Sequence, residues 1–149
     1  MTPNLRPARA EDASALGRIL FQFQHQHDWM PELYTQDDCE HFCATMIARG
    51  WVTVVWSGHD VRGFMARDGA EICALYLAGR STGRGIGTAL IDHAKATETQ
   101  LWLRCAAANA SACRFYRRHG FVEAARSGGE SNDENIPDIL YVWPREALA

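Results

Sequence analysis

The chain of 149 residues lacks any long uninterrupted apolar stretch. Its longest apolar run covers residues 51–56 and is interrupted by Thr53, whereas a membrane-spanning helix needs about 20 apolar residues. The first residues have no apolar signal-peptide core, and lipidation motifs are absent at both ends. We therefore expect a cytoplasmic protein with no membrane partner.

An excess of basic charge is also missing. The net charge is −3 and the sequence pI is near 6.0, so a nucleic-acid partner would have no bulk electrostatic support, and we expect none. Apolar residues make up 47% and charged residues 22% of the chain, which is typical of an ordinary globular protein. The length predicts a single domain over residues 1–149.

The cysteines do not form an even, regularly spaced set. There are five, at positions 39, 43, 73, 105 and 113, and without a secretion signal this pattern predicts reduced thiols. Cys39, His41 and Cys43 have a spacing that could suggest a metal site. On a helix, however, Cys39 and Cys43 share a face from which His41 points away. We therefore expect two small core residues and no metal.

The most informative stretch runs from residue 75 to residue 90. An apolar strand pattern leads into a turn that carries Gly83, Gly85 and Gly87, and a helical pattern begins there at once. Such a turn leaves backbone N–H groups free at the positive end of the helix dipole, which suits a phosphate or pyrophosphate. The turn has no lysine, as a Walker loop would need, and Thr88 stands where a dinucleotide fingerprint needs glycine. A tight turn without a ligand is the alternative.

A second motif follows at residues 109–121, which read Asn-Ala-Ser-Ala-Cys-Arg-Phe-Tyr-Arg-Arg-His-Gly-Phe. With both motifs in this order, the chain resembles the GNAT superfamily of N-acetyltransferases, strongly over residues 71–121. The turn at 82–87 is similar to that family's acyl-CoA pyrophosphate loop, although the loop usually opens with Gln or Arg and here opens with Thr82. From the residues alone, Asn109 is also a good helix N-cap, and Gly120 with Phe121 forms a Schellman ending.

The resemblance implies an α/β fold with a mixed, mostly antiparallel central sheet, helices on both faces, and a splay between the fourth and fifth strands. The sequence pattern gives the same element order. A capping box at Thr35 and Asp38 predicts the start of the second helix, and Phe42 is among its expected core residues. The expected strands cover residues 5–8, 51–56, 61–66, 70–78, 101–106, 122–126 and 139–143. The expected helices begin at 11–12, 35, 85 and 110, and the first ends before an irregular segment at 22–34.

The resemblance also implies acetyl-CoA as the co-substrate and no metal. The backbone of Leu75 and Leu77 would hydrogen-bond the pantetheine arm. The remaining cofactor-binding residues that we predict lie around the glycine turn and at the start of the later helix: Arg80, Thr82, Gly83, Arg84, Gly85, Ile86, Gly87, Thr88 and Asn109.

For catalysis we predict Tyr116 as the general acid, because the family's motif places this hydroxyl beside the CoA sulfur. The alternative is a core aromatic residue. An alkyl amine with a pKa near ~10.4 arrives protonated, so a base must remove a proton. Glu71 is the predicted base, and strand parity would put it on one face with Cys73 and Leu75. A solvated Glu71 and a water chain are the alternatives.

The acceptor side is less defined. Trp29 and Tyr34 in the irregular segment would wall the acceptor pocket or else pack in the core. The polar stretch at 127–135 carries acidic residues that either attract a cationic amine or belong to a mobile solvated loop. Three histidines are alternative bases by pKa alone. The acidic residues are Glu130, Asp133 and Glu134, and the histidines are His25, His27 and His59.

The implied function is direct transfer of an acetyl group from acetyl-CoA to a primary amine within a ternary complex. The acceptor is a small-molecule or peptide amine whose identity the sequence does not reveal. A non-catalytic acyl-CoA sensor of the same fold and a structural subunit that binds no CoA are the competing hypotheses. The resemblance is also compatible with a homodimer.

Overall fold

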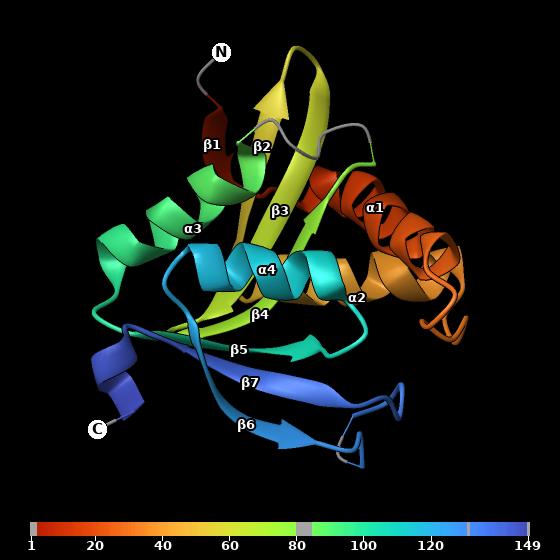
Figure 1. Ribbon diagram of the computed structural model, residues 1–149. Coiled ribbons are helices and arrows are strands. Elements are labelled where there is room, and N and C mark those ends of the chain that lie inside the picture. The colour runs from red at the N-terminus through yellow and green to blue at the C-terminus, as the bar shows by residue number, and fades with distance from the viewer. Residues whose placement is uncertain (1–2, 80–84, 131, 149) are drawn as a thin grey trace.

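The computed structural model describes residues 3–79, 85–130 and 132–148. Within these residues the chain forms a seven-stranded sheet in the order β1-β2-β3-β4-β5-β7-β6, with helices on both faces (Figure 1). The strands are β1 (Asn4–Pro7), β2 (Val52–Ser57), β3 (Asp60–Asp68), β4 (Glu71–Leu77), β5 (Leu101–Ala106), β6 (Val122–Ser127) and β7 (Asp138–Trp143). The helices are α1 (Ala13–Gln26), α2 (Gln36–Ala48), α3 (Ile86–Thr97) and α4 (Ala110–Arg118), with short 3₁₀ turns at Ala10–Asp12 and Arg145–Leu148.

The sheet consists of two antiparallel halves that meet at one parallel contact. Strands β1 to β4 form one half, and β5, β7 and β6 form the other. Between β4 and β5, the register pair found in the described residues is Glu71 with Trp102, and the Trp102 N–H donates to the Ala70 carbonyl at 3.0 Å. Beyond this pair the two strands diverge, and α4 lies in front of them (Figure 1). The expected fold class and the splay between the fourth and fifth strands are confirmed.

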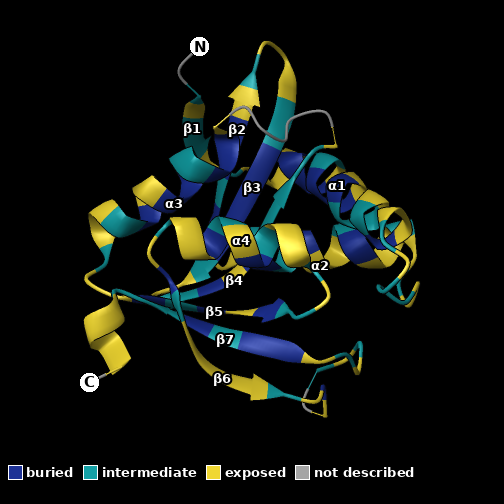
Figure 2. Cartoon of the chain, in the orientation of Figure 1, coloured by how far each residue is buried: buried dark blue, intermediate teal, exposed yellow. Residues whose placement is uncertain are grey.

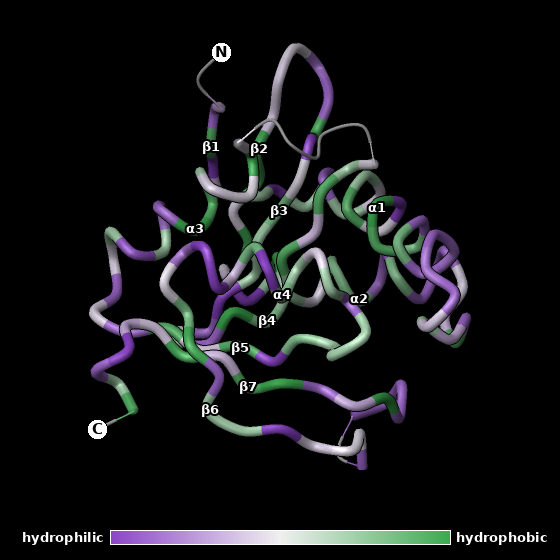
Figure 3. The backbone as a smooth tube through the Cα atoms, viewed as in Figure 1, coloured by the Kyte–Doolittle hydropathy of each residue, from purple (hydrophilic) through white to green (hydrophobic). Residues whose placement is uncertain are grey.

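Two apolar clusters lie on opposite faces of the sheet. One joins the sheet to α3 and α4 and includes Leu90, Ile91 and Tyr141, and the other joins it to α1 and α2 and includes Leu16 and Phe64. Figure 2 shows the buried residues on the central strands and on the helix faces that meet them. Figure 3 shows hydrophobic residues along β4, one of the two strands that border the gap between the sheet halves, and along α1. None of the helices in the described parts of the chain has the length and apolar character that crossing a bilayer requires.

Helix α1 is longer than expected. Residues 22–26, which we expected to be irregular, continue α1 to Gln26. The reason is tertiary: Gln24 is 3% exposed, its Nε2 donates to the Tyr34 carbonyl at 2.8 Å, and its Oε1 accepts the Tyr34 N–H at 2.9 Å. One side chain thus satisfies the backbone of the segment that follows the helix.

Helix α2 begins as predicted and packs differently in one respect. Thr35 and Asp38 form the expected capping box. Cys39 and Cys43 are buried, and all five cysteines are free thiols. Phe42 is 50% exposed, so its expected place in the core was wrong. The buried face of α2 is narrow, and Phe42 lies at its edge.

An extra residue in β4 overturns the expected side-chain parity. Ala74 pairs with Ala66 of β3 and Ile72 with Arg67, so Cys73 is bulged out of the ladder. A bulge reverses the alternation beyond it. As a result Ile72 and Leu75 pack into the same cluster, and Glu71 faces the side of the sheet opposite to Leu75. The expectation that Glu71, Cys73 and Leu75 share a face was wrong.

Candidate active site

Two cavities adjoin the gap between β4 and β5. The first, of about 790 Å³, opens at the start of α3, and we call it the α3 cavity. The second, of about 290 Å³, is bordered by β5, the start of β7 and the segment before it, and we call it the β7 cavity. Both share one wall, which consists of Phe23, Leu75, Tyr76, Ala112 and Tyr116. The two cavities therefore lie next to each other along this wall.

The start of α3 presents free backbone donors to the α3 cavity. Gly85 is the N-cap residue, with a left-handed φ of 76° that favours glycine. The N–H groups of Ile86, Gly87 and Thr88 have no partner among the described residues, and at the positive end of the helix dipole they suit an anion. Gly85, Gly87 and Thr88 line the cavity. Ile86 also borders the cavity, although its side chain is buried in the core.

Gly87 is needed for close packing. A Cβ at this position would lie 3.0 Å from the ring of Phe115 on α4. The two helices therefore approach each other closely beside the cavity, which helps to define its floor.

Leu75 and Leu77 turn their backbone polar groups toward the gap. The Ala78 N–H donates to Arg62 of β3 at 2.8 Å, and backbone direction alternates along a strand. The N–H and C=O groups of Leu75 and Leu77 accordingly point away from β3, where β5 has already diverged. Both residues line the α3 cavity. The predicted role of their backbone is compatible with this geometry.

The far side of the α3 cavity is formed by α4 and its ends. Asn109 caps α4 by accepting the Ala112 N–H at 3.3 Å, and it also lines the cavity. Thr88 Oγ1 lies 3.2 Å from His119 Nε2. Burial, followed by the charge of Lys95, lowers the pKa of His119. The sequence analysis did not select His119 as a site residue, because a basic residue in the last turn of a helix is already explained by its favourable interaction with the helix dipole.

The C-terminus of α4 has the expected Schellman geometry. Gly120 has φ 87°, its N–H donates to Arg117, and the Phe121 N–H donates to Tyr116 at 3.0 Å. Phe121 packs back on Tyr116, with ring centroids 5.6 Å apart. This ending fixes Tyr116 on the shared wall.

Tyr116 is 7% exposed, and within the described part of the chain its hydroxyl has no hydrogen-bond partner. Buried polar groups in folded proteins are usually paired, so this hydroxyl is an exception that a ligand could resolve. Burial raises the pKa of Tyr116 well above its ordinary value, which keeps the phenol protonated and able to donate.

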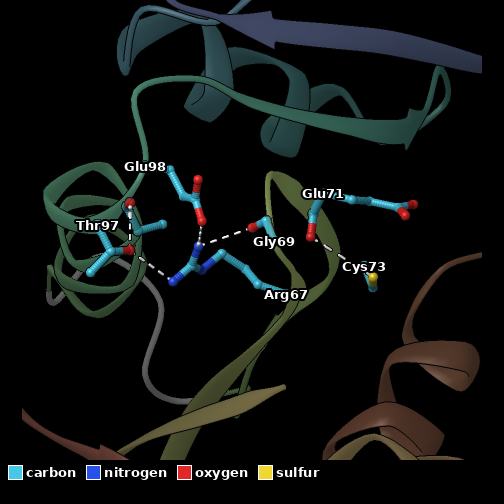
Figure 4. A network of polar contacts seen from close by, with 7 residues as sticks. Arg67, Gly69, Glu71, Cys73, Thr97 and Glu98 are labelled. Carbon is cyan, nitrogen blue, oxygen red and sulfur yellow. Dashed lines mark hydrogen bonds and ion pairs between the residues drawn. The ribbon is translucent and has the colours of Figure 1, made fainter. Parts of the chain in front are cut away.

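Glu71 lies elsewhere. It is at the closed end of the gap, where it pairs with Trp102, and it is absent from the lining of both cavities. Its carboxyl group points away from Arg67, whose guanidinium contacts Thr97 and Glu98 (Figure 4). The structure does not bring Glu71 and Tyr116 to a common cavity, and a catalytic role for Glu71 stays a prediction.

Several other expected residues can be located. Trp29 lines the β7 cavity, and His27 lines the α3 cavity. His25 is exposed and lies 2.9 Å from Glu32. His59 is exposed in the β2–β3 turn, away from the gap. The predictions at Arg80, Thr82, Gly83 and Arg84 fall outside the described residues.

The β7 cavity contains two charged residues that the sequence analysis did not select, Arg104 and Asp138, together with Glu134. No sequence motif marks Arg104 as a site residue, and the pattern around it predicts only its place in a strand. Tyr34 donates to Asp133 at 3.2 Å and thereby links the segment after α1 to the segment before β7. Tyr34 itself is not part of the cavity lining.

The split sheet, the helix N-terminus with free N–H groups and the buried tyrosine agree with the result of comparing the chain with known protein families. The model of the Acetyltransferase (GNAT) family matches residues 10–121. The chain belongs to the GNAT acetyltransferase family, and it is an acetyl-CoA-dependent acyltransferase. The predicted resemblance is confirmed.

Among curated proteins, the peptidyl-lysine N-acetyltransferase YjaB of Salmonella typhimurium is 26% identical over 147 residues, which cover 97% of this chain and 100% of that protein. Among solved structures, apo-form YjaB from Escherichia coli has a TM-score of 0.80 at 23% identity, covering 96% and 98% of the two chains. The structure of yncA, a putative acetyltransferase from Salmonella typhimurium with its cofactor acetyl-CoA, has a TM-score of 0.71 at 16% identity, covering 95% and 92%. The similarity to these two solved structures shows that the fold is shared.

Proposed function

We propose that this protein transfers the acetyl group of acetyl-CoA to a primary amine by direct attack within a ternary complex. The observation that carries the proposal is the buried, unpartnered hydroxyl of Tyr116 on the wall that the two cavities share. A donor in the α3 cavity and an acceptor in the β7 cavity would meet there. No covalent acetyl-enzyme is required for this arrangement.

The described residues fit acetyl-CoA on the donor side. The N–H groups of Ile86, Gly87 and Thr88 would hold the pyrophosphate, and the gap-facing backbone of Leu75 and Leu77 would bind the pantetheine arm. We retain Arg80, Thr82, Gly83, Arg84 and Asn109 as proposed contacts. A free N–H near Leu77 is also suited to stabilising the developing oxyanion, because a fixed donor needs no reorganisation.

Tyr116 would act as the general acid. As the bond between the acetyl carbon and sulfur breaks, the leaving thiolate would take the phenolic proton. The parent thiol has a pKa around ~8.5, so this assistance is moderate, in keeping with the low end of the ~10²–10⁴-fold range for acid–base catalysis. The amine must lose a proton before it attacks, and the sequence offers Glu71 or a water chain as its acceptor.

A lysine side chain of a protein or peptide is the acceptor class to test first. The support is the name of the curated relative, a peptidyl-lysine N-acetyltransferase, and the aromatic and acidic lining of the β7 cavity, which includes Trp29, Tyr76 and Glu134. A long alkyl chain can pack against aromatic rings while its ammonium group meets a carboxylate.

The decisive experiment measures CoA release with acetyl-CoA and a panel of amines that includes capped lysine, polyamines and amino acids. We expect turnover with at least one amine and a fall of up to about 10²-fold in Tyr116→Phe. Titration calorimetry with acetyl-CoA is done in parallel. Binding without CoA release on any amine would favour the acyl-CoA sensor, and the absence of binding would favour a structural subunit.

A further inference from the structure

One carboxylate in the β7 cavity has no partner. Glu134 is half-buried and lines this cavity together with Leu75, Tyr76 and Tyr116. In the described residues its side chain makes no hydrogen bond and no ion pair. Its charge acts on Tyr76: burial first, and then Glu134, raise the pKa of Tyr76 to about 12. Glu134 thus lines the same cavity as Tyr76 of the shared wall.

The segment that carries Glu134 is held in a defined conformation. Asn132 anchors it through two bonds to Ile136, in which Nδ2 donates to the carbonyl at 2.8 Å and Oδ1 accepts the N–H at 3.1 Å. Asn135 has a left-handed φ of 52°, a conformation that asparagine tolerates better than most residues. Glu134 lies between these two asparagines and is directed by the turn they form.

The other charged groups around the cavity are already paired or neutral. Arg104 Nη1 and Asp138 Oδ1 are 3.8 Å apart, and Asp138 also accepts from Ser127 Oγ at 2.6 Å. Asp133 accepts from the Tyr34 hydroxyl. The remaining titratable groups of the lining stay neutral at ordinary pH, because burial raises the pKa of each: Cys73, Tyr76, Cys105 and Tyr116.

We propose that Glu134 is the residue that binds the acceptor's ammonium group in the β7 cavity and removes its proton. This inference rests on the proposed function and assigns its missing base. A cation that enters the cavity finds Glu134 as the one unpaired carboxylate among the described lining residues. The unpartnered hydroxyl of Tyr116 lies on the wall of the same cavity, where it would donate its proton to the leaving sulfur.

The step balances without a further reactant. Glu134 takes one proton from the ammonium nitrogen, whose lone pair then forms a bond to the acetyl carbon. The bond from that carbon to sulfur breaks, and the sulfur takes the Tyr116 proton. The second proton lost by the nitrogen restores the Tyr116 hydroxyl through solvent, and Glu134 releases its proton to water. The net products are the acetylamide, the CoA thiol and one proton.

Position distinguishes Glu134 from the earlier candidate. Glu71 is at the closed end of the gap, on the face of the sheet opposite to Leu75, and borders neither cavity. A base must come within hydrogen-bond reach of the proton it removes. Glu134 shares a cavity with the predicted acid, whereas Glu71 does not.

The test compares Glu134→Gln with Glu71→Gln and with Glu130→Gln. Glu130 is a matched control, since it is an exposed carboxylate of the same segment that is absent from the cavity lining. The probe is Nα-acetyl-lysine methylamide. For each protein, kcat and kcat/KM are measured from pH 5 to pH 10, and calorimetry measures the affinity of the probe for the CoA-bound enzyme.

We expect Glu134→Gln to lower kcat/KM by about 10²-fold or more and to weaken probe binding about tenfold. Glu130→Gln should match the unmutated protein. An unchanged kcat/KM in Glu134→Gln, or the larger loss in Glu71→Gln instead, would overturn the assignment. If the unmutated protein acetylates no amine, the proposed function fails. The binding comparison then still decides whether Glu134 holds an ammonium group, because equal affinity in both proteins would refute it.

Discussion

Replacing Tyr116 with phenylalanine removes one oxygen atom from a side chain that is 7% exposed. In the described structure that oxygen has no hydrogen-bond partner, so the folded protein bears the cost of an unsatisfied buried hydroxyl. Leaving such a group unpaired costs about 1–3 kcal/mol. The substitution should therefore make the free enzyme more stable while it slows the reaction.

The expected gain in stability is taken from the lower end of this range of free energies for an unpaired buried group. A gain of about 1 kcal/mol should raise Tm by roughly 2–4 °C in a domain of this size. Saturation with acetyl-CoA should reverse the order, since only the tyrosine can donate to the bound thioester. At about a hundredfold excess over Kd, acetyl-CoA should stabilise the unmutated protein by ~2.7 kcal/mol and Tyr116→Phe by less.

Tyr141→Phe provides the opposite control. Tyr141 is fully buried, and its hydroxyl accepts a hydrogen bond from Arg117 at 3.1 Å. Losing this bond should lower stability by about 1 kcal/mol and leave kcat unchanged. Calorimetric melting with and without acetyl-CoA gives two Tm values for each protein, and CoA-release rates give kcat. A lower Tm for Tyr116→Phe in the free enzyme, or an unchanged kcat, would refute the reasoning about this hydroxyl.

Three further predictions concern stability. Asp12→Asn breaks the two-bond contact with Arg6, at 2.8 and 3.0 Å, and should cost about 2 kcal/mol in urea unfolding. In the unmutated protein Arg6 lowers the pKa of Asp12, so this contribution is present above the ordinary carboxyl pKa and is lost as the pH falls below it. Gly87→Ala should lose about 1 kcal/mol, despite the better helix propensity of alanine, because its Cβ would lie 3.0 Å from Phe115. Stability should also fall between about pH 10 and pH 12, because unfolded tyrosine ionises near ~10 while burial raises the pKa of Tyr76 to about 12.

The sequence predicted the parts of the fold that local chemistry determines. The strand at Leu101–Ala106 was expected over those residues, and its buried residues Leu101, Leu103 and Cys105 alternate with more exposed ones. The ending of α4 at Gly120 follows from local backbone bonds. The predicted cofactor contacts depend on the same kind of local signal, since a glycine turn and a helix start are adjacent in sequence.

The remaining features depend on contacts between distant segments. Residues 22–26 continue α1 because Gln24 binds the backbone of Tyr34, which no local pattern reveals. The bulge at Cys73 is visible only in its pairing with β3. The segment before β7 has the polar composition of a solvated loop, yet Asn132 orders it. The position of Glu134 at the β7 cavity therefore depends on these ordering contacts, which the amino-acid composition does not reveal.

The bulge and the gap depend on each other in a way that explains the position of the site. Before Cys73, β4 still pairs with β5 at Glu71, and beyond it β4 keeps its pairing with β3 but leaves β5. A bulge bends its strand and increases the local twist, so β4 turns away from β5 at the point where the ladder between them ends. Unpaired backbone groups in such a gap would cost free energy unless a ligand or water satisfied them. Among the described residues, the groups of Leu75 and Leu77 that face this gap are unpaired, so the gap is retained where a ligand with amide groups could bind.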